Sequence, residues 1–245
     1  MGLISRIVTS LRAGSVVPSP NIWQWPEVYE AENRAQDADG AIWAALDEIC
    51  DWTGDVLDVG CGDGFHLPRF AARARSVLGV EPHPPLVDRA VARVAGTPAV
   101  AALLGSAQDL PVADGTFDVV HARTAYFFGP GCEAGLREAD RALRPGGVLV
   151  VVDLDGRHAP YGRWMRADMP RYDPAEVDRF FQIEGFALRR VVSTWRFPDR
   201  ETLEAVLRIE FSAQVAERAI AEVPGLEIPV GYRVLWRRKP RGLIV

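Results

Sequence analysis

The chain has 245 residues, of which 48% are hydrophobic and 25% are charged, and its formal net charge at pH 7 is −5. This mixture is ordinary for a soluble globular protein and excludes a disordered or fibrous chain. An acidic chain does not attract phosphate backbones, so the composition disfavours a nucleic-acid partner. The cysteines, Cys50, Cys61 and Cys132, are too scattered for a disulfide scaffold, and no CxxC pair indicates zinc. We therefore expect a cytoplasmic protein without a metal site.

The N-terminal residues 1–17 contain several apolar side chains, but Arg6 and Arg12 interrupt them. The segment therefore has neither a signal-peptide core nor the run of roughly 20 apolar residues that a membrane span needs. We interpret residues 1–50 as a helical segment that covers the functional site. In chain order we expect a weakly amphipathic helix over 1–17, an extended loop over 16–26, and helices over 27–37 and 39–50.

From residue 51 onward, short apolar runs alternate with amphipathic segments. This alternation is typical of an α/β domain in which helices cover both faces of a parallel sheet. A ligand of such a sheet is expected at the carboxyl ends of its strands. We expect strands at 55–59, 76–80, 99–104, 117–122 and 148–152, and helices at 65–74, 86–95 and 132–143.

The C-terminal part of the same domain, which we take to span 51–245, departs from simple alternation. Residues 155–172 are rich in arginine, proline, histidine and aromatic side chains, and we interpret them as a lid-like insertion. We then expect a helix at 174–184, a strand at 186–197, a helix at 200–223 that covers one side of the pocket, and a last strand at 230–238.

The most informative segment is a glycine loop between the first strand of this domain and the helix that follows it. Gly60, Gly62 and Gly64 permit a tight turn and let a ligand approach the bare backbone. The spacing is GxGxG, and Phe65 stands where a dinucleotide-binding GxGxxG motif would have its last glycine. No Lys-Ser/Thr pair follows, so the loop is not a P-loop. Glu81 ends the next strand, where a carboxylate accepts hydrogen bonds from ribose hydroxyls.

Five segments occur in the order and spacing of one known family. They are VLDVGCGDGF at 56–65, Glu81, GSAQDLP at 105–111, FDVV at 117–120 and LRPGG at 143–147. Together they resemble the class I S-adenosylmethionine-dependent methyltransferases, in particular the small-molecule branch that includes ubiquinone and menaquinone methyltransferases. The resemblance covers about 51–153. It implies a Rossmann-like, doubly wound sheet of seven mostly parallel strands, with the last strand inserted antiparallel.

The resemblance also implies S-adenosylmethionine as cofactor and S-adenosylhomocysteine as product. In that case Asp58 reaches the ammonium group, Glu81 holds the ribose, and Ser106 and Ala107 lie beside adenine. The family often has an acid where this chain has Ser106, which leaves the partner of the adenine amine open. The cofactor-binding residues implied are Asp58, Gly60, Cys61, Gly62, Gly64, Glu81, Pro82, Ser106, Ala107, Gln108 and His121.

Methyl transfer leaves no fixed catalytic signature, because the cofactor supplies the electrophile and the protein mainly aligns the nucleophile. A base is needed only where the acceptor holds a proton of high pKa. The candidates for such a base are His121, Tyr126 and His158, although a lone histidine is more often a hydrogen-bonded structural residue. By the same reasoning His66 and His83 are interpreted as structural or solvated.

Aromatic side chains are expected to frame the acceptor pocket, which suits an aromatic or apolar acceptor. The alternative is that several of them only pack helices onto the sheet. The candidates are Trp23, Trp25, Tyr29, Tyr126, Phe127, Tyr161, Trp164 and Trp195.

The sequence therefore predicts an enzyme that transfers a methyl group from S-adenosylmethionine to oxygen, nitrogen or carbon of a small molecule. A catalytically silent cofactor-binding regulatory protein is one alternative. A nicotinamide-dependent oxidoreductase is another, disfavoured by the glycine spacing. The sequence leaves open whether the protein is a monomer or a homodimer.

Overall fold

The computed structural model of the protein describes residues 16–126 and 129–242. Most of the helix expected over 1–17, and the pocket candidate Phe127, lie outside this part of the chain. None of the helices within it combines the length and the apolar character that a membrane-spanning helix needs.

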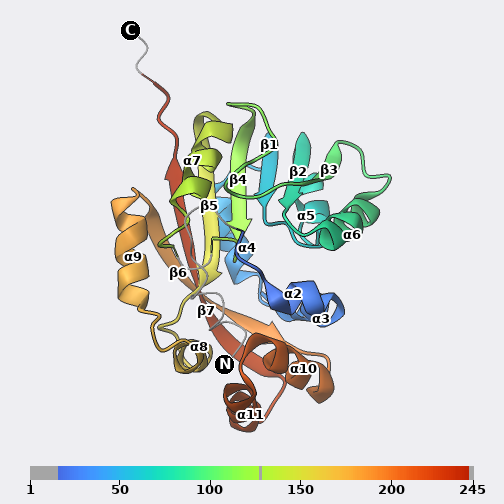
Figure 1. Ribbon diagram of the computed structural model, residues 1–245, viewed down its shortest axis with the longest axis vertical. Coiled ribbons are helices and arrows are strands. Elements are labelled where there is room, and N and C mark those ends of the chain that lie inside the picture. Colours follow the sequence, from blue (N-terminus) through green and yellow to red (C-terminus); the bar gives the residue numbers. More distant parts are fainter. Residues whose placement is uncertain (1–15, 127–128, 243–245) are drawn as a thin grey trace.

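One seven-stranded sheet forms the centre of the protein, in the order β3-β2-β1-β4-β5-β7-β6 (Figure 1). The five strands from β3 to β5 are parallel, whereas β7 runs antiparallel to both β5 and β6. This confirms the expected Rossmann-like fold with its last strand inserted antiparallel. The strands are β1 Asp55–Val59, β2 Ser76–Glu81, β3 Val100–Leu104, β4 Phe117–Arg123, β5 Leu143–Leu154, β6 Ala187–Arg196 and β7 Glu227–Arg238.

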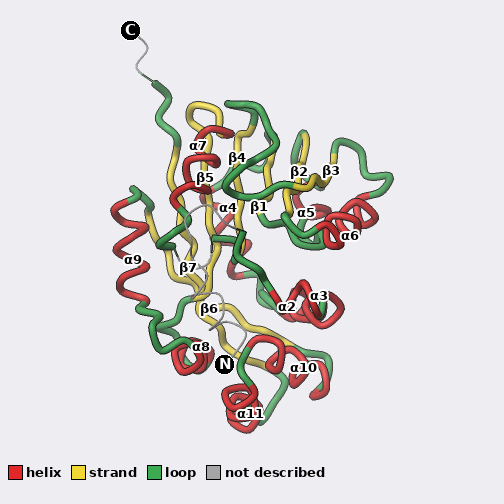
Figure 2. The backbone as a smooth tube through the Cα atoms, in the orientation of Figure 1, coloured by secondary structure: helices red, strands yellow, loops and turns green. Residues whose placement is uncertain are grey.

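Helices lie on both sides of the sheet (Figure 2), because successive side chains of a strand point to opposite faces. Val56 and Val119 pack into a core with residues of α4, α5 and α6, while Leu57 and Val120 pack into a second core with residues of α7 and α9. The helices are α2 Pro20–Gln24, α3 Pro26–Ala35, α4 Ala41–Ile49, α5 Leu67–Ala71, α6 Pro84–Val94, α7 Glu133–Ala142, α8 Tyr161–Asp168, α9 Pro174–Ile183, α10 Arg200–Glu210 and α11 Ala213–Glu222.

The long antiparallel strands β6 and β7 extend beyond the parallel part of the sheet, and α8, α10 and α11 gather at that end (Figure 1). Helices α2 and α3 lie between this group and the glycine loop. Within residues 16–50, Ile42 and Leu46 of α4 are fully buried in the main core. The part of that segment placed to cover a site is therefore α2 and α3.

Segment 155–172, which the sequence predicts to be a lid-like insertion, is partly helical. It contains helix α8, whose Tyr161, Trp164 and Met165 recur at helical spacing and are buried. The apolar face is short and is flanked by arginines and prolines, so the helical pattern was not recognised in the sequence. A lid that opens to solvent would have to expose these three side chains, so the packing argues against that role.

Three other boundaries also differ from the expectations. The helix expected over 65–74 shortens to α5, and the loop expected over 16–26 contains the short helix α2. The helix expected over 200–223 divides into α10 and α11. Phe211 has extended dihedral angles at the break, and its side chain is buried. Asp168 accepts a hydrogen bond from the next backbone amide, that of Ser212, at 3.2 Å. Tertiary contacts thus hold this break in an otherwise helical pattern.

Candidate functional site

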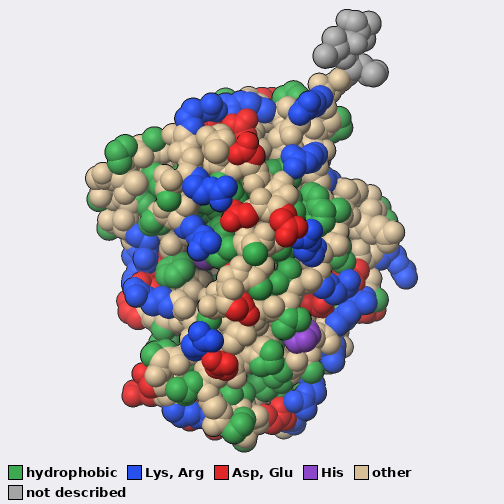
Figure 3. All heavy atoms as spheres, turned by 180° about the vertical axis from the view of Figure 1, so that it is seen from behind, with side chains coloured by type: hydrophobic (Ala, Val, Ile, Leu, Met, Phe, Trp, Pro, Cys, Tyr) green, Lys and Arg blue, Asp and Glu red, His purple; other side chains and the backbone are tan. Residues whose placement is uncertain are grey.

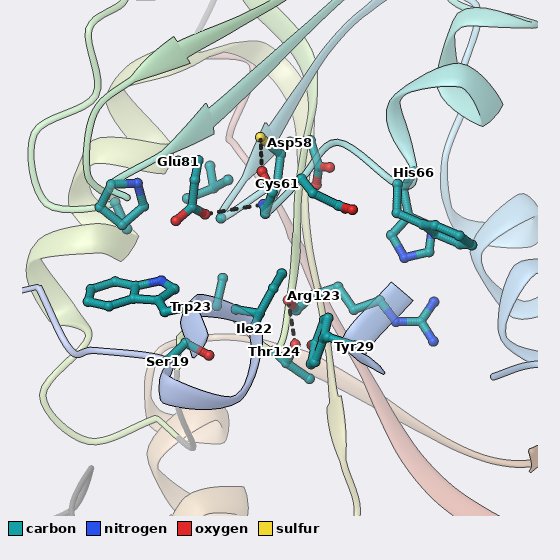
Figure 4. A pocket seen from close by; sticks show the side chains of 18 of the residues that line it. Ser19, Ile22, Trp23, Tyr29, Asp58, Cys61, His66, Glu81, Arg123 and Thr124 are labelled. Atoms are coloured by element: carbon teal, nitrogen blue, oxygen red, sulfur yellow. Dashed lines mark hydrogen bonds between the residues drawn. The ribbon is translucent and has the colours of Figure 1, made fainter. Parts of the chain in front are cut away.

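An open pocket with about 1010 Å³ of free space lies at the carboxyl ends of β1, β2 and β4. Figure 4 shows the glycine-loop side above it and helices α2 and α3 below it. Its position agrees with the expectation for an open parallel sheet. The predicted site residues that line it are Trp23, Tyr29, Asp58, Gly60, Cys61, Gly62, Glu81, Pro82, Ser106, Ala107 and Gln108.

The glycine loop forms the upper wall, and its conformation needs glycine. Gly60 and Gly62 have φ of 71° and 57°, in the left-handed region that residues with a Cβ avoid. A Cβ added at Gly60 would lie 2.6 Å from the Cβ of Ala125. The amides of Gly60 and Cys61 donate to the carbonyl of Val80 at 2.8 and 3.1 Å, which holds the loop against β2. The loop therefore presents bare backbone to the pocket.

Glu81 ends β2 and is only 5% exposed. One carboxylate oxygen accepts from the amide of Gly62 at 3.1 Å and the other from the amide of His83 at 3.0 Å. Each oxygen has a second lone pair available for a ligand hydroxyl. Burial raises the pKa of Glu81 to about 7, since the two amide bonds offset only part of the desolvation. Trp23 stacks on the imidazole of His83, with ring centroids 4.4 Å apart, and closes this end of the pocket.

Asp58 and His121 form a buried pair under the glycine loop. Parallel pairing of β1 with β4 sets Asp58 beside His121, and Nδ1 of the imidazole lies 2.7 Å from a carboxylate oxygen of Asp58. His121 is 0% exposed and packs against aromatic rings that include Phe70 and Trp52. Its Nε2 has no hydrogen-bond partner among the described residues. Donation from Nδ1 fixes the carboxylate of Asp58, which itself lines the pocket.

The far end of the pocket is polar. Arg123 at the end of β4 is 9% exposed, and its guanidinium donates to the side-chain carbonyl of Gln36 at 2.6 Å. Figure 4 shows His66 on the upper side of this end, with Arg123 and Tyr29 on the lower side. Burial, followed by the charge of Arg123, lowers the pKa of His66 well below its usual range. Thr124 completes the lining here. This end therefore carries one buried positive charge beside a neutral imidazole.

Comparisons with known proteins agree with this geometry. Residues 57–151 match the family described as "Methyltransferase domain". A 2-methyl-6-phytyl-1,4-hydroquinone methyltransferase of Synechocystis sp. is 31% identical over 190 residues, which cover 75% of this chain and 55% of that protein. The chain therefore contains a methyltransferase domain over residues 57–151 and is similar to class I S-adenosylmethionine-dependent methyltransferases.

A second relative is a tRNA U34 carboxymethyltransferase of Cellvibrio japonicus, 36% identical over 149 residues. Those residues cover 56% of this chain and 46% of that protein. The chain thus spans about half the length of the curated relatives it matches.

Solved structures share the fold of this chain. A methyltransferase of Thermotoga maritima superposes with a TM-score of 0.57 at 21% identity, over 89% of this chain and 98% of that one. The [4+2]-cyclase SpnF superposes with a TM-score of 0.54 at 24% identity, over 77% of this chain and 76% of that one. At these identities the likeness concerns the fold alone. The cyclase shows that this fold is not restricted to one reaction.

Several predicted site residues do not reach the pocket. Gly64 packs behind the loop against Ala90, and His121 lies behind Asp58. Trp25 is 52% exposed outside the pocket. The remaining residues predicted for the site but found elsewhere are Tyr126, His158, Tyr161, Trp164 and Trp195.

These outlying aromatic side chains have structural partners. The hydroxyl of Tyr161 donates to Glu210 at 2.6 Å, and the indole of Trp164 donates to Glu222 at 2.6 Å. Tyr126 is buried against α7, and burial raises the pKa of its hydroxyl. His158 is half-buried and packs on Gly231. The alternative that such residues have packing roles therefore describes four of the candidates, Tyr126, Tyr161, Trp164 and Trp195. Among the described aromatic candidates, Trp23 and Tyr29 line the pocket.

The sequence reasoning missed the polar end of the pocket. Tyr29, Asn33 and Gln36 follow one another at helical spacing, so they share the face of α3 that lines the pocket. The helical spacing of these three polar side chains could have indicated a polar helix face from the sequence. Arg123 stands two residues after His121 on the same strand and therefore shares its face. In the described part of the chain, no group of three His, Cys, Asp or Glu side chains could hold a metal ion.

Proposed function

We propose that this pocket binds S-adenosylmethionine and that the protein transfers the methyl group to a small-molecule acceptor. The convergence of Asp58, the glycine loop and Glu81 on one pocket carries the proposal. Glu81 offers two carboxylate oxygens to the two ribose hydroxyls. Gly60 and Gly62 leave room for the amino-acid part beside their amides, and Asp58 offers a carboxylate to its ammonium group.

Adenine is assigned to the end lined by Ser106, Ala107 and Gln108. The residue after β3 in this chain is not an acid, so we assign the contact with the adenine amine to neutral groups there. His121 acts as a positioning residue, because its Nδ1 holds Asp58 and the imidazole does not reach the pocket.

The bound cofactor supplies an electrophilic methyl group on a positively charged sulfur. The protein aligns the acceptor with that group and excludes water, which suits a pocket closed by α2 and α3. The proton of an acidic acceptor needs a destination, and His66 is the pocket histidine whose lowered pKa leaves it neutral. It replaces His121, Tyr126 and His158 as the candidate base.

A small-molecule acceptor is favoured by the enclosed site and by the mixed charge of the surface. On the face seen in Figure 3, acidic and basic side chains are interspersed rather than gathered into one basic patch. One relative is named for a hydroquinone acceptor and another for tRNA, so the relatives favour neither class. The polar far end of the pocket favours an acceptor with hydrogen-bonding groups over a purely apolar one.

Calorimetric titration with S-adenosylmethionine and S-adenosylhomocysteine tests the cofactor assignment, with NADH as the competing ligand. We expect a dissociation constant on the order of micromolar for the two sulfur cofactors and no heat from NADH. Glu81→Ala should weaken binding about tenfold or more, which corresponds to about 1.4 kcal/mol. NADH binding without cofactor binding would favour the oxidoreductase alternative.

A second experiment separates the enzyme from a silent cofactor-binding protein. The protein is incubated with S-adenosylmethionine and a library of small phenols, amines and acids, and S-adenosylhomocysteine is measured. Its formation above the acceptor-free rate supports methyl transfer. Tight cofactor binding without turnover on any acceptor class would favour the regulatory alternative.

A further inference from the structure

The guanidinium of Arg123 is a buried cation without an acidic partner in the described residues. It donates to the neutral amide of Gln36 at 2.6 Å and also contacts the neutral phenol of Tyr232, with the guanidinium carbon 5.5 Å from the ring centroid. A guanidinium has five N–H donors and stays charged in proteins. A buried charge is costly unless it is paired, so this arrangement favours an anion supplied from elsewhere.

The carboxyl of Glu32, which influences Arg123 electrostatically, does not supply that charge. Glu32 is buried on α3 next to Glu210, and both its burial and this neighbour raise its pKa well above the usual range. The raised pKa means that this carboxyl ionises less readily than a free glutamate, and it forms no ion pair with Arg123 among the described residues. The amide of Gln36 bridges the two groups, donating to Glu32 at 2.8 Å while accepting from Arg123.

Arg123 is also placed where a ligand can reach it. It lines the pocket, unlike His121, which lies two residues earlier on the same strand. Val59 pairs with Ala122 across the sheet, so Arg123 follows at the level of Gly60. The acidic residues Asp58, Asp63 and Glu81 line the same pocket. Among the described residues, the lining therefore combines three carboxyl side chains with one guanidinium.

We propose that Arg123 binds a carboxylate group at this end of the pocket, supplied either by the amino-acid part of the cofactor or by the methyl acceptor. The assignment rests on the proposed function, because it takes the occupant of the pocket to be the sulfonium cofactor with its acceptor. The planar guanidinium presents paired N–H groups that match the two oxygens of a carboxylate.

Two ligands distinguish the cofactor as the source. S-adenosylhomocysteine carries the carboxylate, whereas 5′-methylthioadenosine keeps the adenosine and the thioether but lacks the amino-acid part. Both are titrated into the wild type, Arg123→Met and the control Arg89→Met. Arg89 forms an ion pair with Glu27 at 2.8 Å and does not line the pocket. If the cofactor supplies the group, Arg123→Met weakens S-adenosylhomocysteine about tenfold or more and leaves 5′-methylthioadenosine unchanged.

A second arm tests the acceptor as the source. Proteins saturated with S-adenosylhomocysteine are titrated with benzoate, phenylacetate and hexanoate, and with the corresponding primary amides, by ligand-observed NMR. If the acceptor supplies the carboxylate, the acids bind the wild type more tightly than the amides and lose that advantage in Arg123→Met. Arg89→Met keeps the preference in either arm.

Thermal unfolding and circular dichroism show whether Arg123→Met is folded. Arg123→Lys serves as a second variant if it is not. Lysine keeps the charge but loses the paired donors, so its effect should lie between those of wild type and Arg123→Met. The proposal is overturned if the folded Arg123 variants bind S-adenosylhomocysteine as the wild type does and the wild type does not prefer acids to amides. Failure of the wild type to bind either adenosine compound would instead refute the proposed function, and this assignment with it.

Discussion

Glu81→Gln should make the unliganded protein more stable at alkaline pH while weakening its cofactor binding. The carboxylate of Glu81 is buried, and its pKa rises from the ordinary value of 4.5 to about 7 because ionisation there is penalised by desolvation. Glutamine has nearly the same shape as the protonated acid and stays neutral at every pH. The substitution therefore removes the cost of ionising this side chain inside the fold.

The magnitude follows from the two pKa values. Below pH 4.5 the side chain is protonated in both the folded and the unfolded chain, so it contributes no pH dependence. Between pH 4.5 and 7 the unfolded chain loses the proton first, and the wild type becomes less stable as the pH rises. Above pH 7 the full penalty is reached, about 3 kcal/mol at about 1.4 kcal/mol for each pH unit. Glu81→Gln avoids that penalty.

Urea unfolding of the unliganded wild type and Glu81→Gln from pH 4.5 to 9 measures the difference. The NH2 group of glutamine cannot accept one of the two backbone hydrogen bonds, which costs about 1–3 kcal/mol at every pH. We therefore expect the gap in unfolding free energy, Glu81→Gln minus wild type, to rise by about 3 kcal/mol from pH 4.5 to pH 7 and to stay constant above it. The exposed Glu217→Gln is the control, and its gap should stay flat with pH. At pH 8 the affinity of Glu81→Gln for S-adenosylhomocysteine should fall about tenfold or more, because glutamine offers one acceptor oxygen instead of two.

Two results would refute this reasoning. A gap that does not change between pH 4.5 and 7 would mean that the buried carboxyl is not the titrating group. Wild-type affinity in Glu81→Gln would mean that the ribose is held elsewhere. A more stable variant that binds less tightly would show that the pocket keeps a destabilising charge for ligand binding.

Further substitutions separate the pocket from the core. Gly60→Ala should cost more stability than Gly115→Ala, because both glycines have positive φ but only the added Cβ at Gly60 meets a neighbour, Ala125. Gly115→Ala should cost about 1–2 kcal/mol for the backbone alone, and equal losses in urea unfolding would contradict the clash. Tyr161→Phe removes the donor to Glu210 and should cost about 1–3 kcal/mol. It should leave the affinity for S-adenosylhomocysteine unchanged in calorimetry. A tenfold loss of affinity would indicate that Tyr161 belongs to the binding site after all.

Local sequence was enough for the parallel half of the sheet and for the cofactor end of the pocket. Strand β1 runs over 55–59 as predicted, and the glycine loop and Glu81 line one pocket. These features are contiguous: an apolar run makes a buried strand, a glycine cluster makes a turn, and parallel strands bring their carboxyl ends together. Each signal lies within a few residues of the structure that it specifies.

The helices of the C-terminal half were harder to predict from the sequence, because their apolar positions are sparse and interrupted. Helix α8 shows too short an apolar face among arginines and prolines to be recognised before its partners are known. The break between α10 and α11 depends on the distant Asp168, which accepts from the backbone at Ser212. Tertiary contacts override helical periodicity at both places.

The sequence by itself predicted that Asp58, Gly60, Gly62 and Glu81 lie at one pocket, since they belong to a local strand, turn and strand. Only the tertiary structure decided the roles of His121 and Arg123, two residues apart on one face of β4. The register of β1 against β4 turns His121 into a buried support for Asp58. The docking of α3 leaves Arg123 at the pocket with a neutral amide as its hydrogen-bond partner. Strand register and helix docking join residues far apart in the chain, and neither can be read from one segment alone.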